Sequence, residues 1–154
     1  MGEKRHIVAI PCSDGYYECN CKLLENISNL FRRVRAMWPM VQWFELYGIK
    51  SPRLTKNLFE RMTDYANIQT NQSEKPNKEI LHNLWANHFM DLSTSKMLDM
   101  FQTAIDLQIH TVKLLCAARV QEIILSMDHH QGTLLHCALR SNLVQYALDF
   151  MKKT

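Results

Sequence analysis

Three cysteines and a histidine near the amino terminus are the residues whose types could hold a metal ion. Cys19 and Cys21 lie two residues apart, which places them on one face of a strand, and Cys12 can approach them across a hairpin. With His6 they would supply the four sulfur and nitrogen ligands that zinc prefers. Their spacing lacks the short paired knuckles of structural zinc sites, so small buried cysteines are the simpler interpretation and we expect no metal.

A second cluster of metal-binding residue types lies near the carboxyl terminus, at His129, His130, His136 and Cys137. Adjacent histidines point in different directions on a helix and do not readily share one metal, so surface histidines are the simpler interpretation. The same region holds GTLLHCA, residues 132–138, which is similar to the opening of an ankyrin repeat. Because this unit occurs once, the sequence does not predict a repeat architecture.

Catalytic chemistry has no recognisable motif in this chain. The four glycines form no phosphate-cradling loop, and no acid pair or nucleophile stands in a known catalytic context. We therefore expect neither an enzyme nor a bound cofactor. An uncharacterised enzyme or metal protein built on the amino-terminal cysteines is the alternative.

The charge balance argues against nucleic acid as a partner. The chain of 154 residues has 18 basic and 15 acidic side chains, a net charge of +3, with both signs interspersed. A nucleic-acid binder concentrates its basic residues on one face, whereas Arg32, Arg33 and Arg35 are typical of a solvated helix face. With five cysteines, no membrane-spanning apolar run and no signal peptide, the sequence predicts a soluble intracellular protein with free thiols.

A mixed set of elements must position these side chains. HIVAIPC and YYECNC flank the turn residues Ser-Asp-Gly, which predicts an amino-terminal hairpin. Apolar side chains recur at helical spacing over residues 22–38 and predict one helix, and VQWFELYGI predicts a third strand over residues 41–49. Ser51 and Pro52 then predict the start of a second helix, which continues to Tyr65.

A polar segment separates this half from the next. Residues 69–78, QTNQSEKPNK, predict a surface loop, and only helical patterns follow it. We predict helices around residues 84–90, over 95–108 and over 110–127, and two shorter ones toward the carboxyl terminus. The fold class is therefore α+β, with a small amino-terminal sheet, associated helices and a helical carboxyl-terminal half.

This arrangement resembles the Skp family, the adaptors of SCF ubiquitin ligases, which share the BTB/POZ fold with elongin C. As in that family, a strand runs into Ser-Asp-Gly at residues 13–15, and a polar loop precedes a tryptophan. From that tryptophan onward the comparison needs no gaps, and seven residues fall where the family keeps the same residue: Trp85, Phe89, Ala104, Leu107, Ile109, Val120 and Ile124. The resemblance implies a Skp-like BTB/POZ domain over residues 6–127 and a helical extension over 128–154 that packs on it.

The resemblance also implies a function. The chain would be a non-catalytic adaptor that binds an F-box-type helical partner and links it to a cullin, in the cytoplasm and the nucleus. The groove for the partner would consist of apolar side chains at helical spacing: Val112, Leu115, Cys116, Val120, Ile123, Ile124 and Met127. A stripe that packs only on the domain's own helices has the same pattern, so both interpretations stay open.

The cullin-facing side departs from the family pattern. Family adaptors carry Asn-Tyr where this chain has Ile105 and Asp106. A carboxylate in place of an aromatic hydroxyl side chain removes apolar contact and adds a charge that an interface must pair or hydrate. The alternative function is therefore a Skp/BTB-fold interaction scaffold, or a homodimer, that has lost cullin binding.

Overall fold

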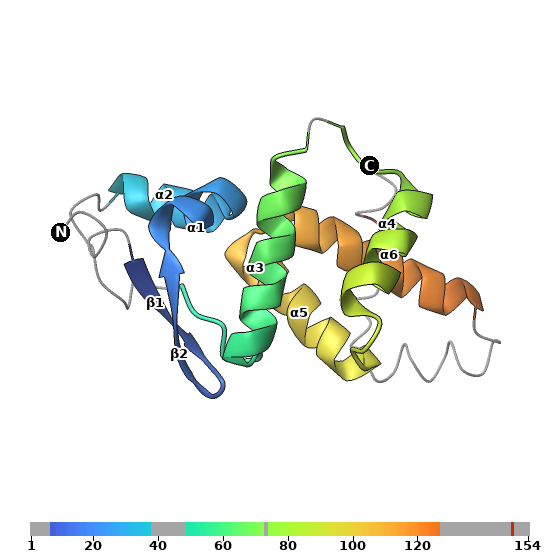
Figure 1. Ribbon diagram of the computed structural model, residues 1–154, viewed down its shortest axis with the longest axis horizontal. Helices are drawn as coiled ribbons and strands as arrows, with labels where there is room; N and C mark the ends of the chain where they lie inside the picture. Colours follow the sequence, from blue (N-terminus) through green and yellow to red (C-terminus); the bar gives the residue numbers. More distant parts are fainter. Residues whose placement is uncertain (1–6, 38–48, 73, 127–148, 150–154) are drawn as a thin grey trace.

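The computed structural model describes residues 7–37, 49–72, 74–126 and 149, and these form a mixed α+β fold in which helices predominate (Figure 1). Two antiparallel strands come first, β1 (Ile7–Cys12) and β2 (Gly15–Asn20). The helices follow in the order α1 (Cys21–Ile27), α2 (Asn29–Met37), α3 (Lys56–Thr70), α4 (Lys78–Phe89), α5 (Thr94–Leu107) and α6 (His110–Ser126). The predicted α+β class is confirmed, while the two predicted carboxyl-terminal helices and the extension over 128–154 fall almost wholly outside the described residues.

The amino-terminal hairpin forms at the predicted turn. Cys12 pairs with Gly15, so only Ser13 and Asp14 connect the strands, and the glycine takes a φ of 133° that L side chains rarely adopt. The Oδ1 of Asp14 accepts a 2.8 Å hydrogen bond from the backbone N–H of Lys56. The tip of the hairpin is therefore fixed to the start of α3.

After α2 the chain returns to the sheet beside β1. Ser51 forms a parallel bridge with Cys12, and its backbone N–H donates a 2.8 Å hydrogen bond to the carbonyl of Pro11. The third strand predicted over residues 41–49 lies outside the described residues except for Ile49, which is buried. The described bridge shows that, after α1 and α2, the chain comes back parallel to its first strand.

The start of α3 differs from the sequence prediction. Ser51 and Pro52 predicted the amino terminus of this helix, but the helix begins at Lys56. Its N-cap is Thr55, whose Oγ1 accepts a 3.2 Å hydrogen bond from the backbone N–H of Leu58. The prediction was wrong because Ser51 takes part in the bridge to β1, a long-range contact that the local Ser-Pro pattern does not reveal.

The single helix predicted over residues 22–38 is two helices, and the reason is Ser28. This buried residue separates α1 from α2 with an extended backbone, φ −117° and ψ 116°. Its Oγ donates a 2.5 Å hydrogen bond to the carbonyl of Leu107 and accepts one of 3.0 Å from the backbone N–H of Phe31. The hydroxyl therefore caps the second helix while it holds a carbonyl at the end of α5.

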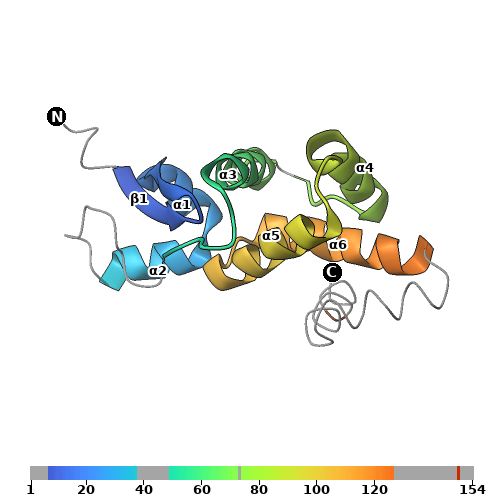
Figure 2. The same cartoon turned by 90° about the horizontal axis from the view of Figure 1, so that it is seen from below.

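The helices lie in two layers. In Figure 2, α1, α3 and α4 form one layer, and α2, α5 and α6 form the other. Helix α6 packs across the layers on α3 and α4 and within its own layer on α5. One hydrophobic cluster runs from Val8 in β1 to Ile123 in α6, so the described elements share a single core.

Candidate functional site

The apolar stripe predicted to hold a partner helix lies in the core of the chain itself. Five of its residues have exposed fractions between 0 and 7%: Val112, Leu115, Cys116, Val120 and Ile123. Ile124 is half-buried and packs against the same core, and Met127 lies outside the described residues. The described part of the stripe is therefore not an open groove, and its burial fits the interpretation in which it packs within its own domain.

In the middle of α6, burial extends around the whole circumference of the helix. The five consecutive residues 114–118 are all buried. At about 100° per residue, five positions cover every face of a helix. Helices α3, α4 and α5 all pack against it. A central position in the fold thus accounts for the apolar excess of this segment, because a helix enclosed on all sides is hydrophobic all round.

The residues that carry the family resemblance belong to the same core. Six of the seven are buried: Trp85, Phe89, Ala104, Leu107, Ile109 and Val120. They come from α4, α5, the residue just before α6 and the middle of α6, and they pack these three helices together. Because their shared property is packing, the resemblance speaks for the arrangement of helices and not for any surface that a partner contacts.

The two residues predicted to face a cullin lie on α5 with different exposures. Ile105 is half-buried and packs against the core. Asp106 is exposed, and its Oδ1 accepts a 3.0 Å hydrogen bond from the Nε2 of Gln102, one turn earlier on the helix. This surface therefore presents a hydrated carboxylate next to a partly covered aliphatic side chain.

The amino-terminal cysteines do not converge on a metal site. Cys12 and Cys19 lie near opposite ends of the hairpin, and Cys21 begins α1. Burial raises the pKa of Cys12 to about 11 and the pKa of Cys19 to about 12, which disfavours the thiolates that zinc binds. Within the described ranges no group of three His, Cys, Asp or Glu could hold a metal ion. His6 and the carboxyl-terminal histidine cluster lie outside those ranges.

A cavity of about 330 Å³ lies where the end of α3 and the α3–α4 connection meet α1, α2 and the start of α6. Its apolar wall consists of four buried side chains: Ile27, Tyr65, Leu81 and Leu114. Its polar wall includes Asn26, Arg32, Gln69, Lys75 and His110. The volume falls in the range of small-molecule pockets. The sequence did not predict this site, because its residues come from separate segments that share no motif.

Side-chain and backbone hydrogen bonds join the elements that surround this cavity. The Nδ2 of Asn26 donates to the Oδ1 of Asn67 at 3.0 Å and to the Oδ1 of Asn71 at 3.2 Å, which joins α1 to the end of α3. The backbone N–H of Asn29 donates a 3.1 Å bond to the carbonyl of Gln108. The junction between α1 and α2 is thereby tied to the junction between α5 and α6.

The start of α6 brings polar groups to the cavity. Burial, together with the positive charges of Lys113 and Lys75, lowers the pKa of His110. The Oγ1 of Thr111 is buried and has no hydrogen-bond partner. Ile109, which precedes the helix, has no side-chain oxygen to cap the first turn. The start of α6 thus brings to the cavity a buried hydroxyl without a hydrogen-bond partner and an imidazole with a lowered pKa.

A second polar cluster joins α4 to α6. The Nδ1 of His82 lies 3.3 Å from one oxygen of Glu122, whose other oxygen pairs with Arg119. The same guanidinium stacks 5.8 Å from the centre of the Trp85 ring. All three side chains are partly covered, and the contact between His82 and Glu122 joins α4 to α6, while the Nε2 of His82 is buried without a hydrogen-bond partner.

Comparison of the chain with protein-family models, with curated proteins and with solved structures finds no match. Among the described residues, no helix has both the length and the apolar character that a membrane span requires.

Proposed function

We propose that this chain is a non-catalytic adaptor with the Skp-type BTB/POZ organisation, which binds an F-box-type helical partner and links it to a cullin. One observation carries the proposal: the order and pairing of the elements. A hairpin, two short helices and a parallel return beside β1 precede four helices, with α6 at their centre. The seven resembling residues support the same helix arrangement, since they pack in its core.

Because the apolar stripe on α6 is buried by the chain's own helices, the adaptor can bind a partner there only after a conformational change. A partner that binds through Leu115, Val120 or Ile123 must first separate the helices that cover them. Each such side chain contributes about 1.5–3 kcal/mol when it is buried. A partner helix must therefore cover the same side chains again, so that the free energy of opening is offset. Partner binding through this stripe therefore requires that a partner helix replace the chain's own helices, and it is not docking onto a preformed surface.

A scaffold without a cullin is the second candidate, and Asp106 favours it. This exposed carboxylate stands where the resemblance implies a tyrosine, and only Gln102 among the described residues hydrogen-bonds it. An interface would have to pair or hydrate the charge. In this form the chain joins helical proteins, or a second copy of itself, without ligase components.

Titration with two purified probes tests the adaptor: an F-box domain, and the amino-terminal domain of a cullin, each measured by calorimetry. The adaptor predicts saturable binding of the F-box domain and, in the presence of that domain, of the cullin. Absence of F-box binding contradicts both the adaptor and its mechanism. F-box binding without cullin binding supports the scaffold.

The double change Ile105→Asn with Asp106→Tyr sharpens this test. If the loss of cullin contact is local to these two positions, the double variant binds the cullin domain more tightly than the unchanged chain does. The matched control is Asp64→Tyr, which adds the same side chain at an exposed position of α3. Equal cullin affinity in all three proteins means that the scaffold lacks further cullin contacts.

A further inference from the structure

The cavity between α1, α3 and the start of α6 has the composition of a binding site and no role in the adaptor proposal. Its apolar wall is formed by Ile27, Tyr65, Leu81 and Leu114, which are between 2 and 5% exposed. These side chains belong to four different helices, so the apolar surface is assembled only by the tertiary fold. An aliphatic or aromatic group in the cavity would find a preformed apolar wall.

The lining of the cavity also includes hydrogen-bond donors and positive charge. Arg32 on α2 and Lys75 in the α3–α4 connection both line the cavity and are exposed to solvent. The Nη2 of Arg32 donates a 2.6 Å hydrogen bond to the Oδ1 of Asn29, which orients the guanidinium. A guanidinium has five N–H groups, so this bond leaves others for a ligand.

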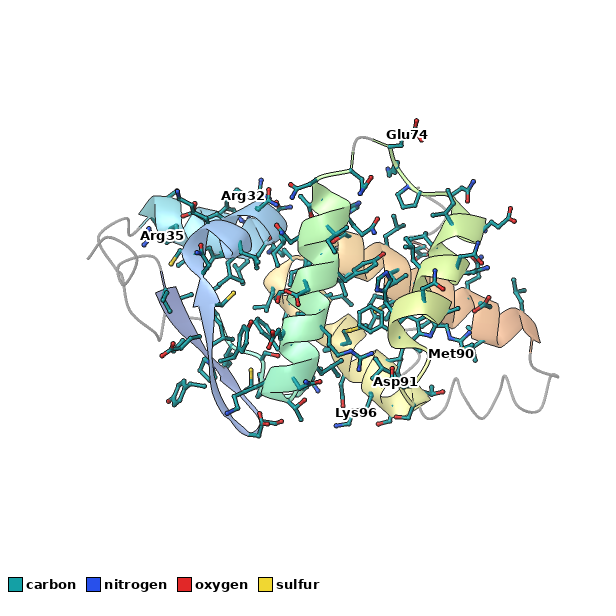
Figure 3. The ribbon with its side chains drawn as sticks, in the orientation of Figure 1. Arg32, Arg35, Glu74, Met90, Asp91 and Lys96 are labelled. Atoms are coloured by element: carbon teal, nitrogen blue, oxygen red, sulfur yellow. The ribbon has the colours of Figure 1, made fainter. Side chains whose placement is uncertain are left out.

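One carboxylate also borders the cavity, and its direction matters. Figure 3 shows Glu74 at the outer edge of the α3–α4 connection, with its carboxylate pointing away from the protein, while Arg32 lies on the far side of the end of α3. The charged residues that line the cavity are thus two cations and an outward-pointing anion. The cations therefore dominate the electrostatic potential between the walls.

Two groups at the start of α6 point to the same ligand chemistry. The buried Oγ1 of Thr111 has no partner, which is costly for a polar group and is relieved when a ligand supplies one. The pKa of His110, an exposed residue, is lowered first by partial burial and then by the positive charges of Lys113 and Lys75. A ligand oxygen can therefore pair with the Thr111 hydroxyl, close to the positive charge of Lys75 at the cavity.

We infer that this cavity binds a small amphipathic anion, with an apolar tail against Tyr65, Leu81 and Leu114 and a carboxylate or phosphate group against Arg32 and Lys75. A purely apolar ligand would make no polar contact with Arg32, Lys75 or the buried Thr111 hydroxyl. A small inorganic anion would leave the apolar wall uncovered. Only a ligand with both ends satisfies the two walls together.

Calorimetric titration with octanoate tests the inference, and two further probes separate the contributions of its ends. Octanol has the tail without the charge, and acetate has the charge without the tail. We expect saturable octanoate binding at roughly millimolar concentration or below, and binding of each of the other probes at least about tenfold weaker. Absence of octanoate saturation, or octanol and octanoate of equal affinity, overturns the proposal.

Substitutions of exposed residues test where the ligand binds, with little expected effect on the fold. Lys75→Gln and Arg32→Gln should each weaken octanoate binding by about fivefold, because each removes one charged contact. The control is Lys96→Gln on α5, which Figure 3 places at the lower edge of the view, away from Arg32 and Glu74 near the upper edge. Equal affinity in all four proteins overturns the site, and if Arg32→Gln loses its helical circular dichroism, Lys75→Gln alone decides.

Amide chemical shifts give an independent location. Octanoate should shift the backbone resonances of His110 and Thr111, which line the cavity, and leave those of Lys96 unchanged. Shifts confined to other parts of the chain overturn the proposal. Neither result depends on an F-box domain or a cullin, so this inference and the adaptor proposal can fail separately.

Discussion

Helices α2 and α6 differ in how much their sequences reveal about their surroundings. In α2, Phe31 and Val34 are buried, while Arg32 and Arg33 are exposed and Arg35 pairs with Glu25 at 3.3 Å. Arg32 and Arg33 thus form the solvated face that the sequence predicted, whereas Arg35, predicted to belong to it, is partly buried. In α6, residues 114–118 are all buried, and no face of that stretch is open to solvent.

The comparison of α2 with α6 shows what can be inferred from the apolar pattern of a helix. A one-sided pattern identifies both the covered face and the solvated face of a helix. A pattern that is apolar all round shows only that something covers every face, and the cover can be the same chain or another one. The predicted partner groove rested on this ambiguity, and the burial of Leu115 and its neighbours shows that the cover is present in this chain.

Truncation of the central helix should have the largest effect. Leu115→Ala removes a completely buried side chain and should lower the free energy of unfolding by about 2–5 kcal/mol, measured by urea denaturation. The matched control is Leu125→Ala at the end of the same helix, where the side chain is 78% exposed and the change should be within about 0.5 kcal/mol. If the two variants lose equal stability, the stripe is not the core described above.

Removal of the Ser28 hydroxyl tests the contact that joins the two regions. Ser28→Ala leaves the carbonyl of Leu107 and the N–H of Phe31 without this partner in a buried place. We expect a loss of about 1–3 kcal/mol in the free energy of unfolding. Ser93→Ala, which removes an exposed N-cap of α5, should cost less, about 1 kcal/mol. Indistinguishable stability of Ser28→Ala and the unchanged chain would mean that this junction is held by other contacts.

The thiol of Cys116 reports whether α6 stays enclosed. Burial raises the pKa of this thiol above its ordinary range. The unfolded chain therefore releases its proton first, and the stability contributed by the neutral thiol is complete below about pH 8.5 and declines as pH rises further. Between pH 9.5 and 10.5 the free energy of unfolding should fall less steeply in Cys116→Ala, by about 1.4 kcal/mol per pH unit. Parallel slopes would show that the thiol ionises in the folded chain.

The smallest expected effect is at the turn into α6. Gln108 has a left-handed conformation with φ 57°, and its side chain accepts a hydrogen bond from the exposed Arg33. Gln108→Gly removes the strain of a side chain at positive φ. It should raise the free energy of unfolding by about 1 kcal/mol, which is measured as a higher midpoint of thermal unfolding. A lower midpoint would mean that the contact with Arg33 outweighs the backbone strain.

Local patterns predicted the elements whose signals are local. The hairpin formed at Ser13 and Asp14, and α5 and α6 lie close to the predicted ranges. The break at Ser28 and the start of α3 at Lys56 were not predicted, because each depends on a hydrogen bond to a residue far away in the sequence. Helix α4 begins at Lys78, earlier than predicted, where Asn77 caps it inside the segment assigned to a loop.

For the candidate sites too, the sequence predicted local features and missed those that depend on contacts between distant segments. The sequence predicted the apolar stripe on α6 but did not reveal that helices of the same chain cover it. The cavity beside Arg32 and Lys75 was not predicted at all. Its wall combines side chains from distant helices, and no spacing rule connects Ile27 with Leu114. The family resemblance could not resolve either point, since its residues pack in the core.

The sequence by itself determined the helical and strand periodicities, the turn at Gly15 and the amount of apolar surface that had to be covered. Only the tertiary structure decided what covers it, where Ser28 interrupts a helix and which polar groups meet at the start of α6. The physical reason is that the hydrophobic effect has no direction: it requires burial of apolar area but does not specify the partner surface. Packing and long-range hydrogen bonds make that choice.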